Sequence, residues 1–106
     1  MAAGGVRPAR VSLEFHPEVA EDLAEAVRRY DPVSHRLGEG VLEEFRRVVR
    51  LAARHPGRFH PAGKRFRRAN LQRFPYHFLY REIEGGIRVT LGRHHRRDPA
   101  YGLGRE

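Results

Sequence analysis

The segment 73–98 most constrains the fold, because its side chains alternate with a period of two on both sides of a glycine pair. Tyr76, Phe78 and Tyr80 alternate with His77, Leu79 and Arg81, and Ile87, Val89 and Leu91 alternate with Arg88, Thr90 and Gly92. Alternation of aromatic and β-branched residues predicts two half-buried strands. Gly85 and Gly86 provide the positive φ angles of a two-residue hairpin turn.

This turn also predicts the register of the hairpin. If Gly85 and Gly86 form the loop, Tyr80 pairs with Leu91 and His77 pairs with His94. The apolar residues of both strands then share one face, as burial requires. We therefore expect a covered apolar face and an open face that carries His77, Arg81 and His94.

The residues before this hairpin predict one strand and two helices. Residues 11–15 alternate as a short strand, and a helix is expected from residues 16–18 to Tyr30, with Glu21 and Asp22 near the positive end of its dipole. Its apolar stripe consists of Ala20, Leu23, Ala24, Val27 and Tyr30.

A second helix is expected between Ser34 and Pro56. Gly38 and Gly40 predict an irregular start, and Glu43 and Glu44 are expected on the solvated side. Residues 57–63 read as a loop and residues 64–72 as a further strand with Ala69 and Leu71 inward. The prediction is an α+β fold: a β-α-α-β-β-β two-layer sandwich with a helical hairpin on one face of a small, mostly antiparallel sheet.

Length and composition indicate one domain in a chain of 106 residues. We expect this domain to span residues 10–101, with a disordered tail at residues 1–9 and a loose C-terminus at residues 102–106. The chain has no cysteine and no apolar run of membrane-spanning length, which favours a cytoplasmic protein.

The net charge of +8 comes entirely from the second half of the chain. Residues 1–54 contain nine basic and nine acidic side chains, and residues 55–106 contain twelve basic and four acidic ones. A basic second half, which contains most of the predicted sheet, predicts a polyanionic partner, either nucleic acid or an acidic protein segment.

Four segments of the chain resemble the RelE/ParE superfamily of toxins from bacterial type II toxin–antitoxin (plasmid stabilisation) modules, and ParE-like members in particular. They are FHPEVAEDLAEA at residues 15–26, LGEGVLEEF at 37–45, RRANLQRFPYHFLYR at 67–81 and HHRRDP at 94–99. Each segment alone is a weak signal. Their order and spacing, together with the predicted topology, make the resemblance specific, and it covers almost the whole chain from Val11.

The resemblance implies a toxin that poisons DNA gyrase, as ParE-like members do. The alternative within the family is a RelE-like endonuclease that cuts mRNA on the ribosome. Either toxin would form a hetero-oligomer with a cognate antitoxin and would need no cofactor and no membrane. A non-catalytic basic RNA-binding module and a degenerate toxin remain alternatives of another class.

A nuclease that uses the 2′-hydroxyl of its RNA substrate needs a base, a cation and an acid around one phosphate. For that metal-independent activity the resemblance implies the catalytic residues His77, Arg81, His94, Arg97 and Tyr101. His94 and His95 could act as base or acid, since histidine titrates near neutral pH. The structural alternative is that His77 and His94 form a polar cross-strand pair.

A second set of basic residues is expected to bind the target or an acidic antitoxin: Arg65, Arg67, Arg68, Arg73 and Arg96. In RelE-like nucleases the corresponding second strand is rich in lysine, so the arginines here depart from the nuclease pattern. We expect no metal site from His77, His94 and His95, because adjacent residues on a strand point to opposite faces.

Overall fold

The computed structural model describes residues 11–106 of the chain, so the predicted disordered tail at residues 1–9 lies outside the described residues. The elements are β1 (Ser12–Phe15), α1 (Val19–Tyr30), α2 (His35–Arg54), a short 3₁₀ helix η1 (Pro56–Arg58), β2 (His60–Ala62), β3 (Phe66–Asn70), β4 (Tyr76–Ile83) and β5 (Gly86–His94). None of the helices in the described part is long and apolar enough to cross a membrane.

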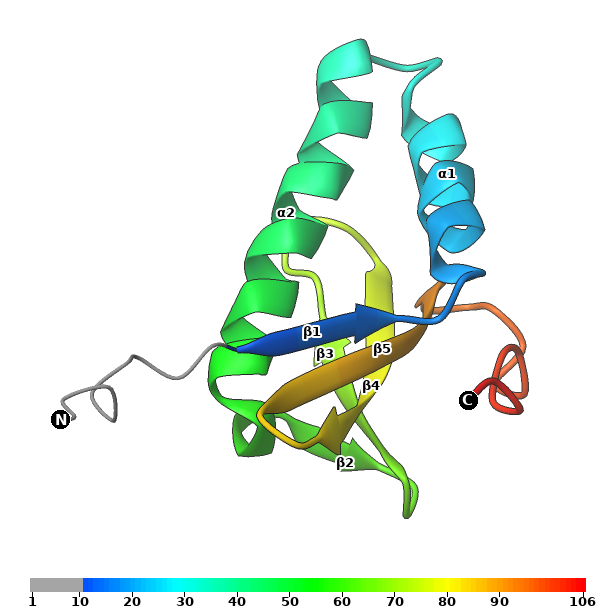
Figure 1. Cartoon of the computed structure of the whole chain (residues 1–106). Coiled ribbons are helices and arrows are strands. Elements are labelled where there is room, and N and C mark those ends of the chain that lie inside the picture. The colour runs from blue at the N-terminus through cyan, green and yellow to red at the C-terminus, as the bar shows by residue number, and fades with distance from the viewer. Residues whose placement is uncertain (1–10) are drawn as a thin grey trace, which may run out of the picture.

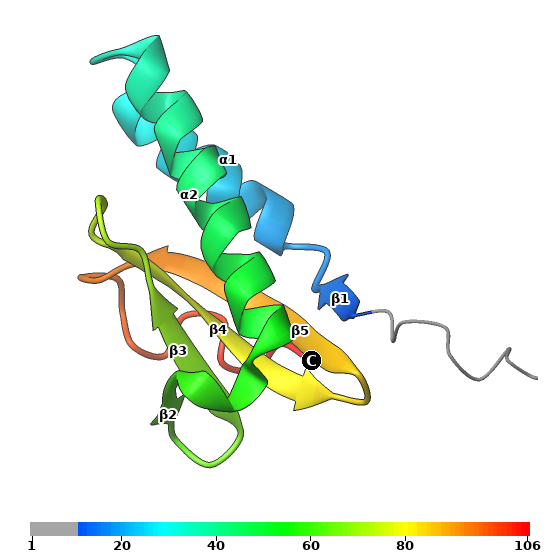
Figure 2. The ribbon, with the colours of Figure 1, turned by 90° about the vertical axis from the view of Figure 1, so that its left-hand side faces the viewer.

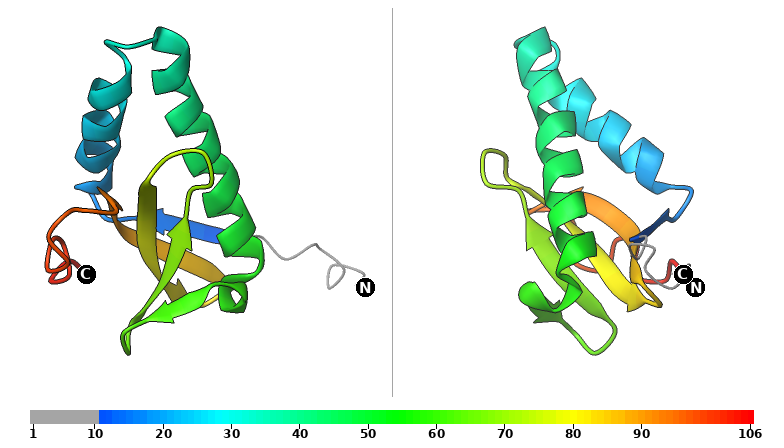
Figure 3. Two further views of the ribbon diagram at one scale, coloured as in Figure 1. Left: turned by 180° about the vertical axis from the view of Figure 1, so that it is seen from behind. Right: turned by 60° about the vertical axis from the view of Figure 1, so that its left-hand side comes forward.

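The five strands form one mixed sheet in the order β1-β5-β4-β3-β2. β1 runs parallel to β5, and the other three pairings are antiparallel. Helices α1 and α2 form a hairpin that covers one face of this sheet (Figure 1; Figure 2). Both views in Figure 3 show the tip of this hairpin extending past the sheet. The predicted α+β architecture is therefore confirmed.

The core lies between α2 and the central strands. Phe78 and Tyr80 of β4 and Val89 of β5 are fully buried and belong to one cluster with Phe45 and Val49 of α2. The rings of Phe45 and Phe78 meet edge to face with their centroids 5.3 Å apart. The predicted core role of the alternating aromatic residues of β4 is confirmed.

The predicted register of the hairpin is wrong along its whole length. Ile83 pairs with Gly86, so the turn consists of Glu84 and Gly85, and only Gly85 has a positive φ angle, 77°. Gly86 serves another purpose, because a Cβ atom there would lie 1.8 Å from the main-chain oxygen of Ser12. The second glycine of the pair thus permits the close approach of β1 to β5.

A β-bulge in the middle of β5 shifts the register again. Tyr80 pairs with Val89, whereas Leu79 pairs with Leu91, which leaves Thr90 as the extra residue. A bulge of one residue exchanges the faces of everything that follows it. Leu91 therefore shares the face of Leu79, away from the helices, and it is not part of the core cluster under α2.

The bulge separates the two histidines that were predicted to pair. His77 lies opposite Arg93, and His94 lies opposite Tyr76. The rings of Tyr76 and His94 meet edge to face with their centroids 5.0 Å apart. The expectation of an open face that carries both His77 and His94 is wrong, because His94 is on the helix side of the sheet.

Helix α2 is more regular than expected, and its start lies close to the end of α1. α2 begins directly after Ser34, and its predicted irregular start is absent from the described helix. Gly38 is buried there, so close to α1 that a Cβ atom at this position would lie 2.8 Å from Asp31 Oδ1. The predicted stripe of α1 is confirmed only in part: Leu23 and Tyr30 are partly buried against the core, whereas the fully buried residues are Val19, Asp22 and Ala26.

Two further segments differ from the prediction. The predicted loop at residues 57–63 contains the end of η1 and the edge strand β2, which pairs with β3.

Glu44 of α2 was expected to be solvated but is only 5% exposed. Its carboxylate accepts hydrogen bonds from the main-chain N–H groups of Gln72 at 2.6 Å and Arg73 at 3.1 Å. Glu44 thereby ties α2 to the turn between β3 and β4.

The C-terminal segment packs against the sheet, although residues 102–106 were expected to be loose. Arg105 forms an ion pair with the buried Asp22 of α1, and the main-chain oxygen of Glu106 accepts a hydrogen bond from Arg88 at 2.6 Å. Figure 2 shows this segment on the side of the sheet opposite α2. The sheet face that was expected to be open is therefore partly covered by the chain itself.

Candidate functional site

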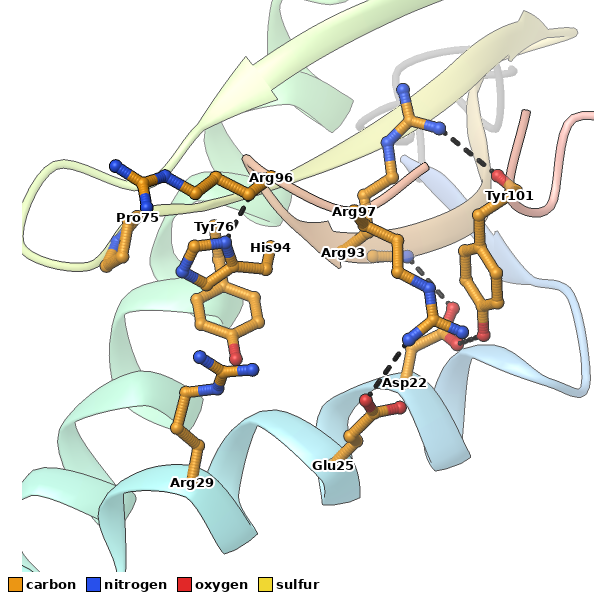
Figure 4. A pocket seen from close by; sticks show the side chains of 11 residues that line it. Asp22, Glu25, Arg29, Pro75, Tyr76, Arg93, His94, Arg96, Arg97 and Tyr101 are labelled. Atoms are coloured by element: carbon orange, nitrogen blue, oxygen red, sulfur yellow. Dashed lines mark hydrogen bonds and ion pairs between the residues drawn. The ribbon is translucent and has the colours of Figure 1, made fainter. Parts of the chain in front are cut away.

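The five residues predicted as catalytic lie in two separate places. His77 and Arg81 are on β4. His94, Arg97 and Tyr101 line a pocket between α1 and the end of β5 (Figure 4). The structure therefore brings three of the five residues together and leaves His77 and Arg81 outside the pocket.

His77 is buried at 3% exposure, and both of its ring nitrogens have partners. Arg93 Nε donates to His77 Nε2 at 3.0 Å, so the ring proton must be on Nδ1. His77 Nδ1 lies 2.9 Å from His95 Nδ1, and we assign His77 as the donor to His95 on the basis of this pattern. His77 is thus held in one tautomer between Arg93 and His95.

Burial, and after it the neighbouring cations Arg68 and Arg93, lower the pKa of His77 from 6.5 to about 3. The pKa of His95 is also lowered, first by burial and then by Arg68, whose Nη2 atom lies 3.3 Å from His95 Nδ1. A histidine with a pKa of about 3 is a neutral imidazole at neutral pH, so it lacks the imidazolium form that acts as a general acid. His77 is therefore a neutral, fixed hydrogen-bonding group.

The pocket at the end of β5 has a volume of about 530 Å³ and a basic lining. Four arginines and two carboxylates line it, which gives a formal charge of +2 with His94 neutral: Arg29, Arg93, Arg96, Arg97, Asp22 and Glu25. It lies where β5 remains paired with β4 but has no strand partner on its other side beyond Val89, whose oxygen accepts the last hydrogen bond from the β1 segment, donated by His16. This unpaired edge of β5 thus becomes one wall of a pocket.

Asp22 of α1 supplies the hydrogen-bond acceptor for this unpaired strand edge. Its carboxylate accepts hydrogen bonds from the Gly92 N–H at 3.0 Å, from the Tyr101 hydroxyl and from Arg105. The hydrogen bond to Asp22, together with burial, raises the pKa of Tyr101. The hydroxyl of Tyr101 is therefore protonated at neutral pH and engaged in a structural contact.

Arg97 and His94 are held beside this cluster. Arg97 lies over the ring of Tyr101, 4.0 Å from its centroid, and forms an ion pair with Glu25 at 3.3 Å. His94 Nδ1 accepts a hydrogen bond from the Arg96 N–H at 3.0 Å, so its proton is on Nε2. Burial lowers the pKa of His94, and Arg29 and Arg96 lower it further.

Arg81 lies on the sheet face opposite the helices, which the C-terminal segment partly covers. Its Nη2 atom lies 3.4 Å from the main-chain oxygen of Glu106. Its Nε atom is buried and has no hydrogen-bond partner among residues 11–106. An unpaired buried donor of this kind is costly, because it has lost its hydrogen bonds to water.

The arginines predicted to bind a partner are dispersed. Arg67 is bound to Glu82 at 3.1 Å and to the Phe59 oxygen at 2.7 Å, and Arg68 is bound to Asn70 and His95. Arg65 and Arg73 lie over the rings of the phenylalanines that follow them. Arg96 is the member of this set that lines the pocket at β5.

Sequence reasoning missed three residues that build these sites: Arg93, Asp22 and Arg105. Arg93 was hidden by the bulge, which the alternation alone does not reveal. Asp22 carried a signal, since it follows Val19 by three positions and precedes Ala26 by four, so it lies on the buried stripe. Within residues 11–106, no group of three or more His, Asp or Glu side chains is arranged to hold a metal ion.

Comparison with known proteins adds no relative: no model of a known protein family matches the chain, and no curated protein matches it.

Proposed function

We propose that this chain is the toxin of a type II toxin–antitoxin module with a RelE/ParE-like fold, and that it arrests growth by binding DNA gyrase. The order of the four resembling segments supports this proposal, as does the α+β architecture with a helical hairpin on one face of the sheet. The formal charge of +8 suits an acidic antitoxin as the neutralising partner.

The observation that favours gyrase over mRNA is the engagement of the candidate catalytic residues. His77 is buried between Arg93 and His95, and the hydroxyl of Tyr101 is bound to Asp22. Cleavage of RNA needs a base, a cation and an acid within reach of a single phosphate. Side chains that are divided between two places and fixed by their own chain support a toxin that acts by binding.

The outer edge of β1 is the surface best suited to a protein partner. Val11, Leu13 and Phe15 have exposed fractions of 48%, 38% and 42%. Ser12 and His16 donate main-chain hydrogen bonds towards β5, so the main-chain groups of Leu13 and Phe15 point away from the sheet. An edge strand with free polar groups and exposed apolar side chains invites a further strand.

The helix beside this edge favours an acidic partner over a second copy of the chain. Arg46, Arg50 and Arg54 of α2 line the two grooves that flank β1. A second copy would bring these arginines close to like charges, whereas an antitoxin segment with alternating apolar and acidic residues would complement them. We therefore propose the edge of β1 as the antitoxin seat.

The function is tested by inducing the chain alone in a bacterial host and mapping new 5′ ends in total RNA. In parallel, the purified chain is added to DNA gyrase with supercoiled plasmid. We expect growth arrest with intact mRNA, together with inhibition or trapped cleavage complexes in the gyrase assay. Codon-linked cuts in translated mRNA would replace this proposal with the nuclease alternative, and absence of arrest would reject a toxin altogether.

The antitoxin seat is tested by co-expression with the small gene beside this one, because antitoxins of the RelE/ParE family are encoded next to their toxins. We expect Leu13→Glu to keep growth arrest but to lose neutralisation, because the new carboxylate opposes an acidic segment. Leu103→Glu is the matched control, since Leu103 has a similar exposed fraction of 40% in the C-terminal segment. Equal neutralisation of both variants would contradict the assignment of β1.

A further inference from the structure

The basic pocket at the end of β5 has a feature that the gyrase proposal does not explain. Most of its charged side chains already have partners within the chain: Arg97 is paired with Glu25, Asp22 with Arg105, and Arg93 with His77 and the main-chain oxygen of Tyr101. Arg29 and Arg96 differ, because neither side chain has a hydrogen-bond or ion-pair partner within the described residues 11–106. Two arginines in one pocket are thus available to a ligand.

These two arginines approach the same place from different elements. Figure 4 shows Arg29 rising from α1 towards the hydroxyl of Tyr76, and Arg96 on the far side of the His94 ring, next to Pro75. Both cations lie close enough to His94 to lower the pKa of its ring. The hydroxyl of Tyr76 and the Nε2–H of His94 add neutral donors between the two guanidinium groups.

We propose that this pocket binds a phosphate monoester carried by a nucleotide or by the phosphorylated end of a nucleic acid. Arginine offers a planar fork of donors that matches phosphate oxygens, and two forks with two neutral donors suit a dianion. The formal charge of +2 in the pocket matches the two charges of such a group. The volume of about 530 Å³ is in the range of small-ligand pockets, so a nucleoside portion also has space.

The two acidic residues of the pocket do not oppose this ligand. Asp22 accepts hydrogen bonds from three donors and its side chain is only 2% exposed, and Glu25 is paired with Arg97. Their charges are therefore largely balanced before a ligand arrives. Binding to the purified chain requires neither gyrase nor growth arrest, so this inference stands or fails independently of the toxin proposal.

The test is calorimetric titration of the full chain in phosphate-free buffer. The probes are inorganic phosphate, adenosine 5′-monophosphate and adenosine. We expect the nucleotide to bind and the nucleoside to bind at least about tenfold more weakly, because a charge-assisted hydrogen bond contributes about 1.5–3 kcal/mol. We also expect inorganic phosphate to compete with the nucleotide. Equal binding of nucleotide and nucleoside, or no binding of either, would overturn the proposal.

The source of the phosphate is distinguished with a short RNA in two forms, one with a 5′-phosphate and one with a 5′-hydroxyl. Tighter binding of the phosphorylated form identifies the end of a nucleic acid as the ligand. Binding of the mononucleotide without any difference between the RNA forms identifies a free nucleotide. An RNA that binds equally in both forms while the mononucleotide does not bind indicates nonspecific backbone contact, which contradicts the site.

Substitutions separate a defined site from general positive charge. We expect Arg29→Gln and Arg96→Gln each to weaken nucleotide binding by about tenfold, which corresponds to the loss of one charge-assisted contact. Arg28→Gln is the matched control: it removes the same charge one residue away, but Arg28 is outside the pocket and paired with Glu21 at 2.6 Å. Equal weakening by Arg28→Gln and Arg29→Gln would reduce the pocket to nonspecific attraction and reject the proposal.

Discussion

Asp22 and Arg105 form an ion pair in which both side chains are nearly buried, with exposed fractions of 2% and 9%. The pair joins the first helix to the last residues of the chain. Asp22 also accepts hydrogen bonds from the Gly92 N–H and the Tyr101 hydroxyl. The Asp22 carboxylate thus binds the unpaired edge of β5 and holds the C-terminal segment against that edge.

Asp22→Ala is expected to lower the free energy of unfolding by about 3 kcal/mol, because it leaves a buried arginine without its partner. Urea unfolding followed by circular dichroism measures this change. Glu21→Ala is the control, since its pair with Arg28 is exposed and an exposed pair contributes less than about 1 kcal/mol. A loss for Asp22→Ala no larger than that for Glu21→Ala would show that the buried pair does not support the fold.

Glu44→Ala is expected to loosen the turn between β3 and β4. The substitution leaves the main-chain N–H groups of Gln72 and Arg73 without their acceptor, which costs about 2 kcal/mol. Hydrogen exchange should become faster at these two amides. Glu43→Ala changes the exposed neighbour on α2 and should leave their exchange unchanged. Unchanged exchange in Glu44→Ala would contradict the role of Glu44 in holding the turn.

Gly86→Ala is expected to displace β1 from the sheet. The added Cβ atom would lie 1.8 Å from the main-chain oxygen of Ser12, and the strands can only separate. We expect a loss of at least about 2 kcal/mol in the free energy of unfolding, as for other overpacked sites. Gly57→Ala is the matched control, because a Cβ atom there meets nothing within 4 Å. Similar stability of the two variants would argue against close contact between β1 and β5.

The sequence predicted the elements of the fold well, because their signals are local. Alternation located β4 and β5, helical spacing and proline located α1 and α2, and the two-layer α+β architecture followed from them. The paired faces of the hairpin were predicted only in part. The extra residue Thr90 reverses the faces beyond it, and a bulge depends on what covers the sheet, which alternation does not record.

The candidate site was predictable in composition but not in geometry. The basic segment at the end of β5 does line a pocket, with His94, Arg97 and Tyr101 among the lining residues. The residues that organise it are far apart in the sequence, as Asp22 and Arg105 are, and no local pattern links them. Of the two buried acids, Glu44 was read as solvated because acidic residues on helices usually are, and Asp22 was read only as a charge at the start of α1.

His77 should make the stability of the protein depend on pH in the acidic range. Its pKa falls from 6.5 to about 3 on folding, so the unfolded chain binds a proton between these values that the folded chain does not. Stability is then complete above pH 6.5 and is lost as the pH falls from 6.5 towards 3, by up to about 1.4 kcal/mol for each pH unit.

His77→Gln removes this proton-binding group, so the free energy of unfolding should fall less steeply between pH 6.5 and 4 than in the parent. Urea unfolding at four or more pH values measures both slopes, and the contribution of the carboxylates cancels in their difference. His60→Gln, on the exposed strand β2, should keep the slope of the parent. If His77→Gln and the parent had the same slope, His77 would titrate normally in the folded protein, and its place between Arg93 and His95 would not exclude a role in acid–base chemistry.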